Sequence, residues 1–156
     1  MNDTTTTDTV SYAKQRLEEL VAFFGANVEV EADVTADGIE LSIGSSAVSP
    51  RLIGHRGDTL RATEFLVGQM VKRHDPLAPR VLVDVAGYKR SRRESLEQMA
   101  HEVAERVKES GQEEELKPMN PAERRIVHMV LREIPGIESE SRGTDRARHI
   151  VVKPAE

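Results

Sequence analysis

Residues 54–57 read Gly-His-Arg-Gly, two glycines around two side chains that carry, or can carry, positive charge. A Gly-x-x-Gly corner exposes main chain with few side chains, so an extended nucleic-acid backbone can approach it closely. An amphipathic run comes directly after it, and the N–H groups at a helix start attract phosphate. We expect Gly54, His55, Arg56 and Gly57 to hold the phosphates of a single strand. The motif alone also fits a tight turn between two helices.

A helix is predicted after this corner, from Asp58 to about Arg73. Its inner face repeats apolar residues at helical spacing, and Asp58 is placed to cap the first turn. Arg61 falls on the next turn, where its guanidinium can reach the same phosphates. A short helix at 49–53, with proline in its first position, is expected before the corner.

A second pair of cationic side chains lies in the run ERRIVH, where Arg124 and His128 stand four positions apart. Residues at this spacing share one face of a helix. A helical wheel places both next to the apolar stripe, so one phosphate could bridge them. The alternative stays open, because most Arg/His pairs on a surface helix bind nothing specific.

A third basic cluster is expected at the start of a long helix, with Lys89, Arg90, Arg92 and Arg93 within five residues. The helix dipole disfavours cations at this end, which invites an external partner such as RNA phosphate. Pairing within the helix, for example between Arg93 and Glu97, explains the cluster equally well.

The sequence lacks the common motifs for catalysis and for metal binding. The chain has no cysteine, no P-loop and no G-x-S-x-G elbow. The run HEVAE has Glu105 where a zinc protease needs its second histidine, and the five histidines lack metal-ligand spacing. We therefore expect neither an enzyme nor a cofactor or metal site.

The charge of the chain is unevenly distributed. The whole sequence of 156 residues has a net charge of −5, whereas residues 51–93 hold ten Lys/Arg against four Asp/Glu, a net +6. A local basic block in an acidic protein indicates an anionic partner at one place, or a basic face that water solvates. No apolar run could span a membrane and no signal peptide is apparent, so we expect a cytoplasmic protein without membrane insertion.

Hydrophobic periodicity divides the chain into two halves. The first half has predicted helices at about 10–24, 49–53 and 58–73 and strands at 27–34, 39–44 and 80–87, in the order α-β-β-α-α-β. The second half has helices at 88–110 and from 121 to about 134 and strands at 137–143 and 148–154, with 113–115 a solvated linker or a short edge strand. Residues 1–9 are Thr-rich and expected to be disordered.

With this element order, the stretch LIGHRGDTL resembles a KH domain of the bacterial (type II) topology, whose Gly-x-x-Gly loop clamps single strands. The run KPMNPAERRIVH resembles the R-three-H domain, named for its Arg-x-x-x-His. In this order, with VDVAGYKRSRRESL between them and RHIVVKP behind, the motifs resemble the Jag family of bacterial proteins over roughly residues 10–154. The resemblance implies an α+β fold with a KH-type domain at 10–87 and, including the linking helix, a small α/β R-three-H-type domain at 88–156.

The resemblance also implies a function: binding of single-stranded RNA, as a post-transcriptional regulator linked to cell-envelope growth or division. Expected partners are RNA and either a small single-KH protein or a second copy of the chain. Longer family members have an additional N-terminal domain, for which we expect no counterpart, because only about nine residues precede the first predicted helix. The competing interpretation is a protein–protein adaptor, in which the KH fold mainly docks a partner protein.

One position departs from the family pattern. The second residue of the glycine corner is usually lysine, and here it is His55. An ordinary histidine is mostly neutral near pH 7 and gains its charge as the pH falls through about 6.5. We therefore expect RNA affinity to rise on acidification.

Overall fold

The computed structural model describes residues 3–25 and 27–155. The chain divides between Lys89 and Arg90 into two compact units, which are described separately. The mixed α+β class expected from the sequence is confirmed, since each unit combines helices with a three-stranded sheet.

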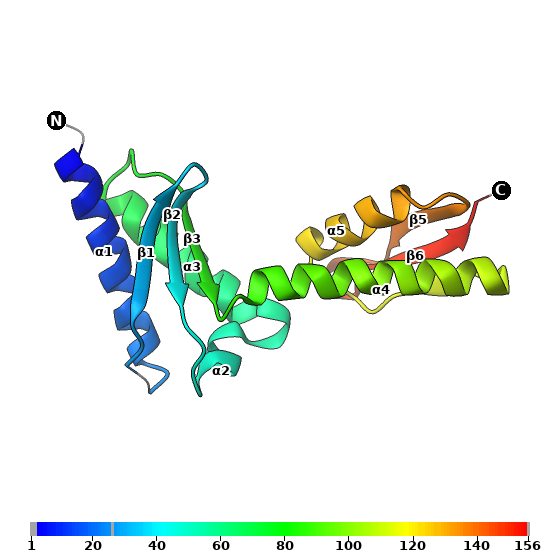
Figure 1. The fold of residues 1–156 in the computed structure, drawn as a ribbon, viewed down its shortest axis with the longest axis horizontal. Coiled ribbons are helices and arrows are strands. Elements are labelled where there is room, and N and C mark those ends of the chain that lie inside the picture. The colour runs from blue at the N-terminus through cyan, green and yellow to red at the C-terminus, as the bar shows by residue number, and fades with distance from the viewer. Residues whose placement is uncertain (1–2, 26, 156) are drawn as a thin grey trace. The chain divides into compact units, whose positions relative to one another are not determined.

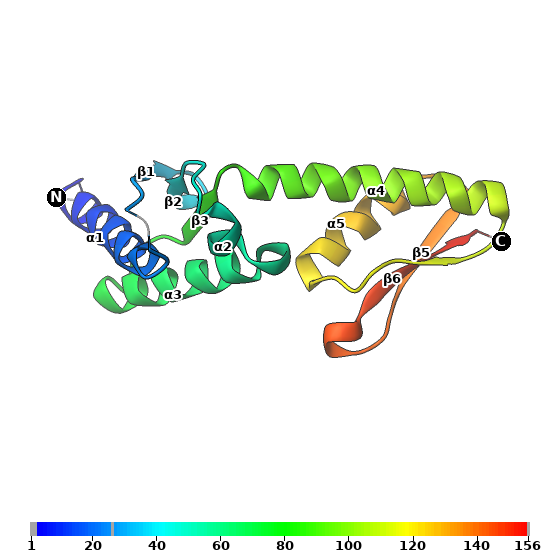
Figure 2. The ribbon, with the colours of Figure 1, turned by 90° about the horizontal axis from the view of Figure 1, so that it is seen from below.

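The first unit has the predicted order of elements (Figures 1 and 2). In chain order these are α1 (Asp3–Ala22), β1 (Val30–Thr35), β2 (Gly38–Ile43), α2 (Ser49–Ile53), the 3₁₀ turn η1 (His55–Gly57), α3 (Asp58–His74) and β3 (Val81–Val85). Strand β2 is central: it pairs antiparallel with β1 and parallel with β3. The parallel pair requires a crossover, and α2 and α3 supply it.

Alternation along these strands builds the first core. Ile39, Leu41 and Ile43 of β2 are buried and pack with Val81, Val83 and Val85 of β3. Helices α1 and α3 cover this face, contributing Leu17, Val21, Val67 and Val71 among others. The opposite face carries Glu40 and Ser42 of β2 and Leu82 and Asp84 of β3, because successive strand side chains point to opposite sides.

The expected disordered segment at 1–9 is wrong for its described part, because α1 begins at Asp3. Tertiary contacts hold α1 at Thr9 and Tyr12, where local composition gave no signal. Thr9 is 2% exposed, and its hydroxyl donates to Asp75 Oδ2 at 3.0 Å. One turn later, the Tyr12 ring stacks on His74 with centroids 4.0 Å apart. Both partners lie at the end of α3, far from α1 in sequence.

The second unit consists of most of the long helix α4 (Tyr88–Ser110), together with β4 (Glu114–Glu115), α5 (Pro121–Arg132), β5 (Ile137–Arg142), the 3₁₀ turn η2 (Asp145–Ala147) and β6 (His149–Pro154). Its sheet has the order β4-β6-β5, antiparallel throughout. The short strand β4 settles the two interpretations of residues 113–115 in favour of an edge strand.

The second core joins α4 to the rest of this unit. The predicted seam residues Leu96, Ala100, Val103 and Val107 are buried with residues of α5, β5 and β6. The predicted start of α5 is confirmed: the Asn120 side chain accepts from Glu123 N at 3.0 Å, and the Glu123 carboxylate accepts from Asn120 N at 3.2 Å. In the described part of the chain, no helix combines the length and the apolar character that a membrane crossing requires.

Candidate nucleic-acid interface

The loop of residues 54–57 joins α2 to α3 and adopts a backbone that favours glycine at both ends. Gly54 has φ +71° and ψ −169°, and Gly57 has φ +78°. A Cβ on Gly54 would lie 2.1 Å from Thr59 Oγ1, and one on Gly57 would lie 2.8 Å from Cε1 of the Tyr88 ring. The two glycines therefore serve both backbone geometry and close packing.

The two residues between the glycines differ in their surroundings. His55 is exposed, whereas Arg56 is half-buried and has φ +51°. An L-residue in this left-handed region is uncommon and mildly strained, and aspartate and asparagine tolerate it better than most residues. The loop thus presents an exposed cation-capable ring at one position and a constrained arginine at the next.

Helix α3 begins without a side-chain cap, contrary to the role predicted for Asp58. Asp58 is the first helical residue, and Gly57, which occupies the N-cap position, has no side chain to offer. The Asp58 carboxylate instead pairs with Arg61 three residues on. Uncapped N–H groups at a helix start are suited to binding an external anion.

A groove of about 470 Å³ continues from the first turn of α3 to the start of β3. Its walls include Arg61, Phe65, Gly68 and Arg80. Phe65 is 64% exposed, and β3 is an edge strand of the sheet. The groove therefore combines an aromatic surface with flanking guanidinium groups, a combination suited to unpaired bases and their phosphates.

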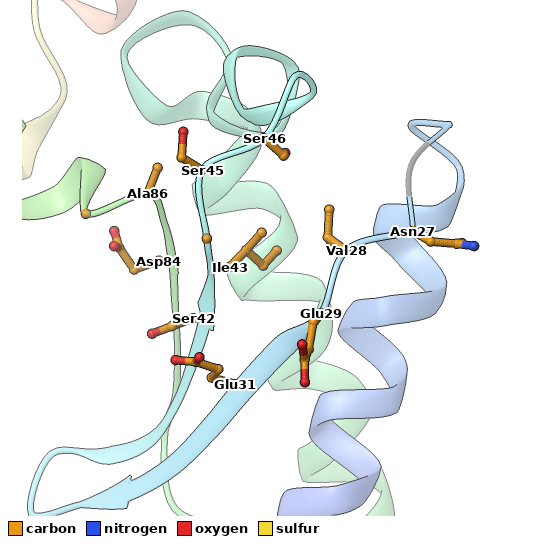
Figure 3. Close-up of a pocket in the computed structure, with 12 residues that line it drawn as sticks. Asn27, Val28, Glu29, Glu31, Ser42, Ile43, Ser45, Ser46, Asp84 and Ala86 are labelled. Atoms are coloured by element: carbon orange, nitrogen blue, oxygen red, sulfur yellow. The ribbon is translucent and has the colours of Figure 1, made fainter.

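A second pocket in the first unit is acidic. Its volume is about 530 Å³, and its lining includes Glu29, Glu31 and Asp84. Ser42 lies between Glu31 and Asp84 (Figure 3). Within the described residues, no three potential ligand side chains are arranged to hold a metal ion. These carboxylates would repel a phosphate, so this pocket does not suit an anionic ligand.

Several cations predicted to contact phosphate have carboxylate partners within the chain. Arg61 pairs with Asp58, and Lys89 pairs with Glu64, whose Oε2 also accepts from Val83 N at 2.8 Å. The cationic ends of both pairs are exposed, so a phosphate could compete for them at the surface.

Arg92 differs from its neighbours in the basic cluster. Its Nε donates to Glu123 Oε1 at 2.8 Å, and the Glu123 side chain is only 6% exposed. The pair fastens the start of α4 to the start of α5. Arg90 is exposed, and Arg93 pairs with Glu97 at 2.8 Å, which is the pairing considered from the sequence. Of the three arginines of this cluster that belong to the second unit, Arg92 is therefore paired with a buried carboxylate, whereas Arg90 and Arg93 are exposed.

The Arg124–His128 pair lies on α5, with both side chains engaged. Arg124 Nη1 donates to the carbonyl of Met119 at 2.7 Å. His128 is exposed, and its Nδ1 lies 2.8 Å from Ser139 Oγ on β5. The Ser139 contact orients the imidazole, leaving Nε2 as the ring nitrogen for an external partner. Ser139 was not predicted, because a contact between a helix and a strand leaves no local sequence signal.

The sequence analysis also failed to single out two groove residues and one exposed arginine near the loop. Phe65 and Arg80 line the groove, whereas Arg51 is exposed on α2, shortly before the loop. Both arginines belong to the basic block at 51–93, and this charge signal could have pointed to them. Lys72 lines the groove too, but its ammonium donates to the carbonyl of Ala78 at 2.5 Å.

A cluster of ion pairs in the second unit shifts the pKa values of its own members. Hydrogen bonds from Arg142 lower the pKa of the Glu113 carboxyl, and a hydrogen bond from Arg106 lowers that of Glu114. The same contacts raise the pKa of each arginine. These pairs join β4 and the residue before it to β5 and α4, and they have a structural role.

Comparison with known proteins supports the motif-based resemblance. Residues 94–154 match the family model of the R-three-H domain, the domain expected from the sequence. The "RNA-binding protein KhpB" of Clostridium symbiosum is 34% identical over 124 residues, covering 80% of this chain and 52% of that protein. The protein of the same name in Bacillus subtilis is 29% identical over 147 residues, covering 93% of this chain and 70% of that one.

A further relative is the "RNA-binding protein KhpB" of Streptococcus pneumoniae, 30% identical over 130 residues, or 81% of this chain and 39% of that protein. The chain thus spans about half the length of the first of these relatives and less of the pneumococcal one. The predicted resemblance to the Jag family is confirmed, because the chain contains an R-three-H domain and is similar to KhpB proteins along most of its length.

Proposed function

We propose that this protein binds single-stranded RNA, with the first unit acting as a type II KH domain. The loop at 54–57 grips phosphates through its main chain and through His55 and Arg56. Bases lie in the groove between α3 and β3, and Arg124 and His128 of the R-three-H domain hold a second stretch of backbone. The naming of the KhpB relatives as RNA-binding proteins supports this assignment.

The observation that carries the proposal is the loop itself. Its two glycines have positive φ and leave no room for a Cβ, so the backbone is held bare at the place where α3 begins uncapped. Because the loop leaves no room for a side chain at either glycine, it suits a ligand that must come close to the main chain. Phosphodiester backbone is such a ligand, and the adjoining groove suits its bases.

The distribution of charge supports the same orientation. The exposed His55 and the groove arginines lie in the basic block, whereas the pocket at Glu29, Glu31 and Asp84 carries the opposite sign. An RNA strand is attracted to one region and repelled from the other. The low aromatic content of 3% limits base stacking to few sites such as Phe65, so we expect modest sequence preference.

The test replaces the middle of the loop rather than its glycines. A Gly→Asp change at 54 or 57 would distort the backbone, whereas His55→Asp with Arg56→Asp removes the cations, and aspartate tolerates the left-handed position 56. Loss of a charge-assisted contact weakens binding by about 2 kcal/mol, or about 30-fold. Fluorescence anisotropy of labelled mixed-sequence RNA measures the effect.

A matched control is Lys14→Glu with Lys108→Gln, which changes the net charge by the same amount at ion pairs of α1 and α4 that have no part in the proposed RNA site. This control should bind RNA within about twofold of the unchanged chain, since exposed pairs contribute little. If both double variants weakened RNA binding equally, the loss would be due to overall charge and not to the loop. A folded loop variant that keeps full RNA affinity would contradict the proposal and favour the protein-adaptor interpretation.

A salt series gives an independent measurement. If four to six phosphates are neutralised, the slope of log affinity against log salt is about −3 to −4, at roughly −0.7 per contact for a single strand. The loop variant should reduce the magnitude of this slope by about one contact.

A further inference from the structure

The first side chain of α4 lies directly against the second glycine of the loop. A Cβ built on Gly57 would lie 2.8 Å from Cε1, 3.4 Å from Oη and 3.5 Å from Cζ of Tyr88. Gly57 is buried, and Tyr88 is half-buried against the first core. The edge of the phenol ring therefore supports the loop backbone where α3 begins.

Tyr88 is itself held by a short and well-fastened connection from β3. Ala86 and Gly87 have φ of +54° and +69°, so the chain turns sharply into α4. Asp84 Oδ1 then accepts from Lys89 N at 3.1 Å, and the Lys89 ammonium pairs with Glu64 of α3. Lys89, the residue after Tyr88, is thus fixed to the sheet and to α3.

The loop is held at its ends by backbone hydrogen bonds from Gly54 N to the Pro50 carbonyl and from Asp58 N to the His55 carbonyl. Its two glycines lose more conformational freedom on ordering than any other residue, and no side chain caps the helix behind them. A loop that is already ordered binds more tightly than one that must be ordered by its ligand. An external support at Gly57 therefore matters for binding as well as for stability.

We propose that Tyr88 is a positioning residue for RNA binding: its ring fixes the backbone of Gly57 and so the direction of the first N–H groups of α3. This inference rests on the proposed RNA binding at the loop. Tyr88 need not touch RNA, but the environment of its ring should change when RNA binds to the loop. A tyrosine that only fills the core would affect stability and would not respond to RNA.

The response can be read from ¹⁹F NMR of the whole chain grown with 3-fluorotyrosine. The sequence has two tyrosines, so the spectrum has two signals, and Tyr12→Phe assigns them. A mixed-sequence single-stranded RNA should shift or broaden the Tyr88 signal and leave that of Tyr12 unchanged. The His55→Asp/Arg56→Asp variant should abolish the response at equal RNA concentration.

Two substitutions separate the ring from its hydroxyl. Tyr88→Phe keeps the ring edge and should bind RNA within about twofold of the unchanged chain, whereas Tyr88→Leu should bind about five- to tenfold more weakly because its loop is less ordered. The Tyr12 signal and a urea titration show that Tyr88→Leu is folded at the assay temperature.

A silent Tyr88 signal under saturating RNA would overturn the inference, and so would full affinity in folded Tyr88→Leu. Either result leaves the proposed function intact, because the unchanged chain still binds. Absence of RNA binding by the unchanged chain would instead refute the proposed function, and the inference with it.

Discussion

Replacement of Gly54 by alanine tests the geometry of the loop most directly. The new Cβ would lie 2.1 Å from Thr59 Oγ1 and 3.0 Å from Thr59 N, so the hydroxyl and the main chain must both give way. Gly54 also has φ +71° and ψ −169°, a region sparsely populated by residues with a side chain. Such a backbone costs about 1–3 kcal/mol, and forced overlap in a packed site adds about 1–3 kcal/mol.

We therefore expect Gly54→Ala to lower the free energy of unfolding by about 4 kcal/mol, the middle of the combined range. Two other glycines of the first unit separate the contributions. Gly87 has φ +69° with nothing within 4 Å of a new Cβ, so Gly87→Ala carries the backbone cost alone, about 1–2 kcal/mol. Gly68 lies within α3 with open space around it, so Gly68→Ala should stabilise the helix by about 0.5–1 kcal/mol.

The assay is urea unfolding monitored by tyrosine emission. The chain has no tryptophan, and Tyr12 and Tyr88 both lie in the first unit, so this signal reports that unit alone. Combination with Thr59→Ala should recover part of the loss at Gly54, because Oγ1 is then gone, although Cβ of residue 59 stays within 2.8 Å. Equal losses at Gly54 and Gly87, without recovery, would refute the close approach on which the loop argument depends.

Three further predictions concern charged residues. Arg92→Ala should destabilise the second unit by about 1–3 kcal/mol, because it leaves the buried Glu123 carboxylate without its guanidinium partner. Arg93→Ala, at an exposed pair, should be nearly neutral. Amide hydrogen exchange of α5 measures both effects, and equal protection in the two variants would contradict the internal role of Arg92. His55→Lys should tighten RNA binding, because lysine places a full positive charge at this exposed position of the loop; an unchanged affinity would show that charge at this position does not contribute. Arg142 lowers the pKa of Glu113, so the contribution of this carboxylate to stability is present above the ordinary carboxyl pKa and is lost as the pH falls through the lowered value. Glu113→Gln should therefore flatten the acid side of a plot of unfolding free energy against pH. An unchanged plot would count against the pair.

Elements with strong local signals were predictable from the sequence. Helix α5 has an Asn120 cap, a proline at its first position and Glu123 closing the capping box, and all three occur as predicted. Helix α4 runs from Tyr88 to Ser110, the predicted bounds. In both cases the terminating signals and the apolar period agree, so local preference and tertiary packing favour the same structure.

The differences arise where distant residues decide. Thr9 and Tyr12 of α1 contact Asp75 and His74, and no property of a Thr-rich segment reveals these partners. The N-cap position falls on Gly57, one residue before the expected Asp58, so α3 begins without a side-chain cap.

The pairing of cations was likewise invisible to spacing. Lys89 meets Glu64 across 25 positions, and Arg92 meets Glu123 across 31. Sequence patterns identified where positive charge gathers, but they could not tell which cations the fold itself would neutralise.

The connection between β3 and α4 restricts how this chain can vary. Tyr88 already stands at Gly57 shortly after β3 ends, and two successive left-handed residues set the path between them. Each residue added to a helix start rotates the rest of the helix by about 100°. A single insertion or deletion between Val85 and Tyr88 would therefore swing the phenol ring out of register with the glycine, so the length of this junction should tolerate less change than its composition.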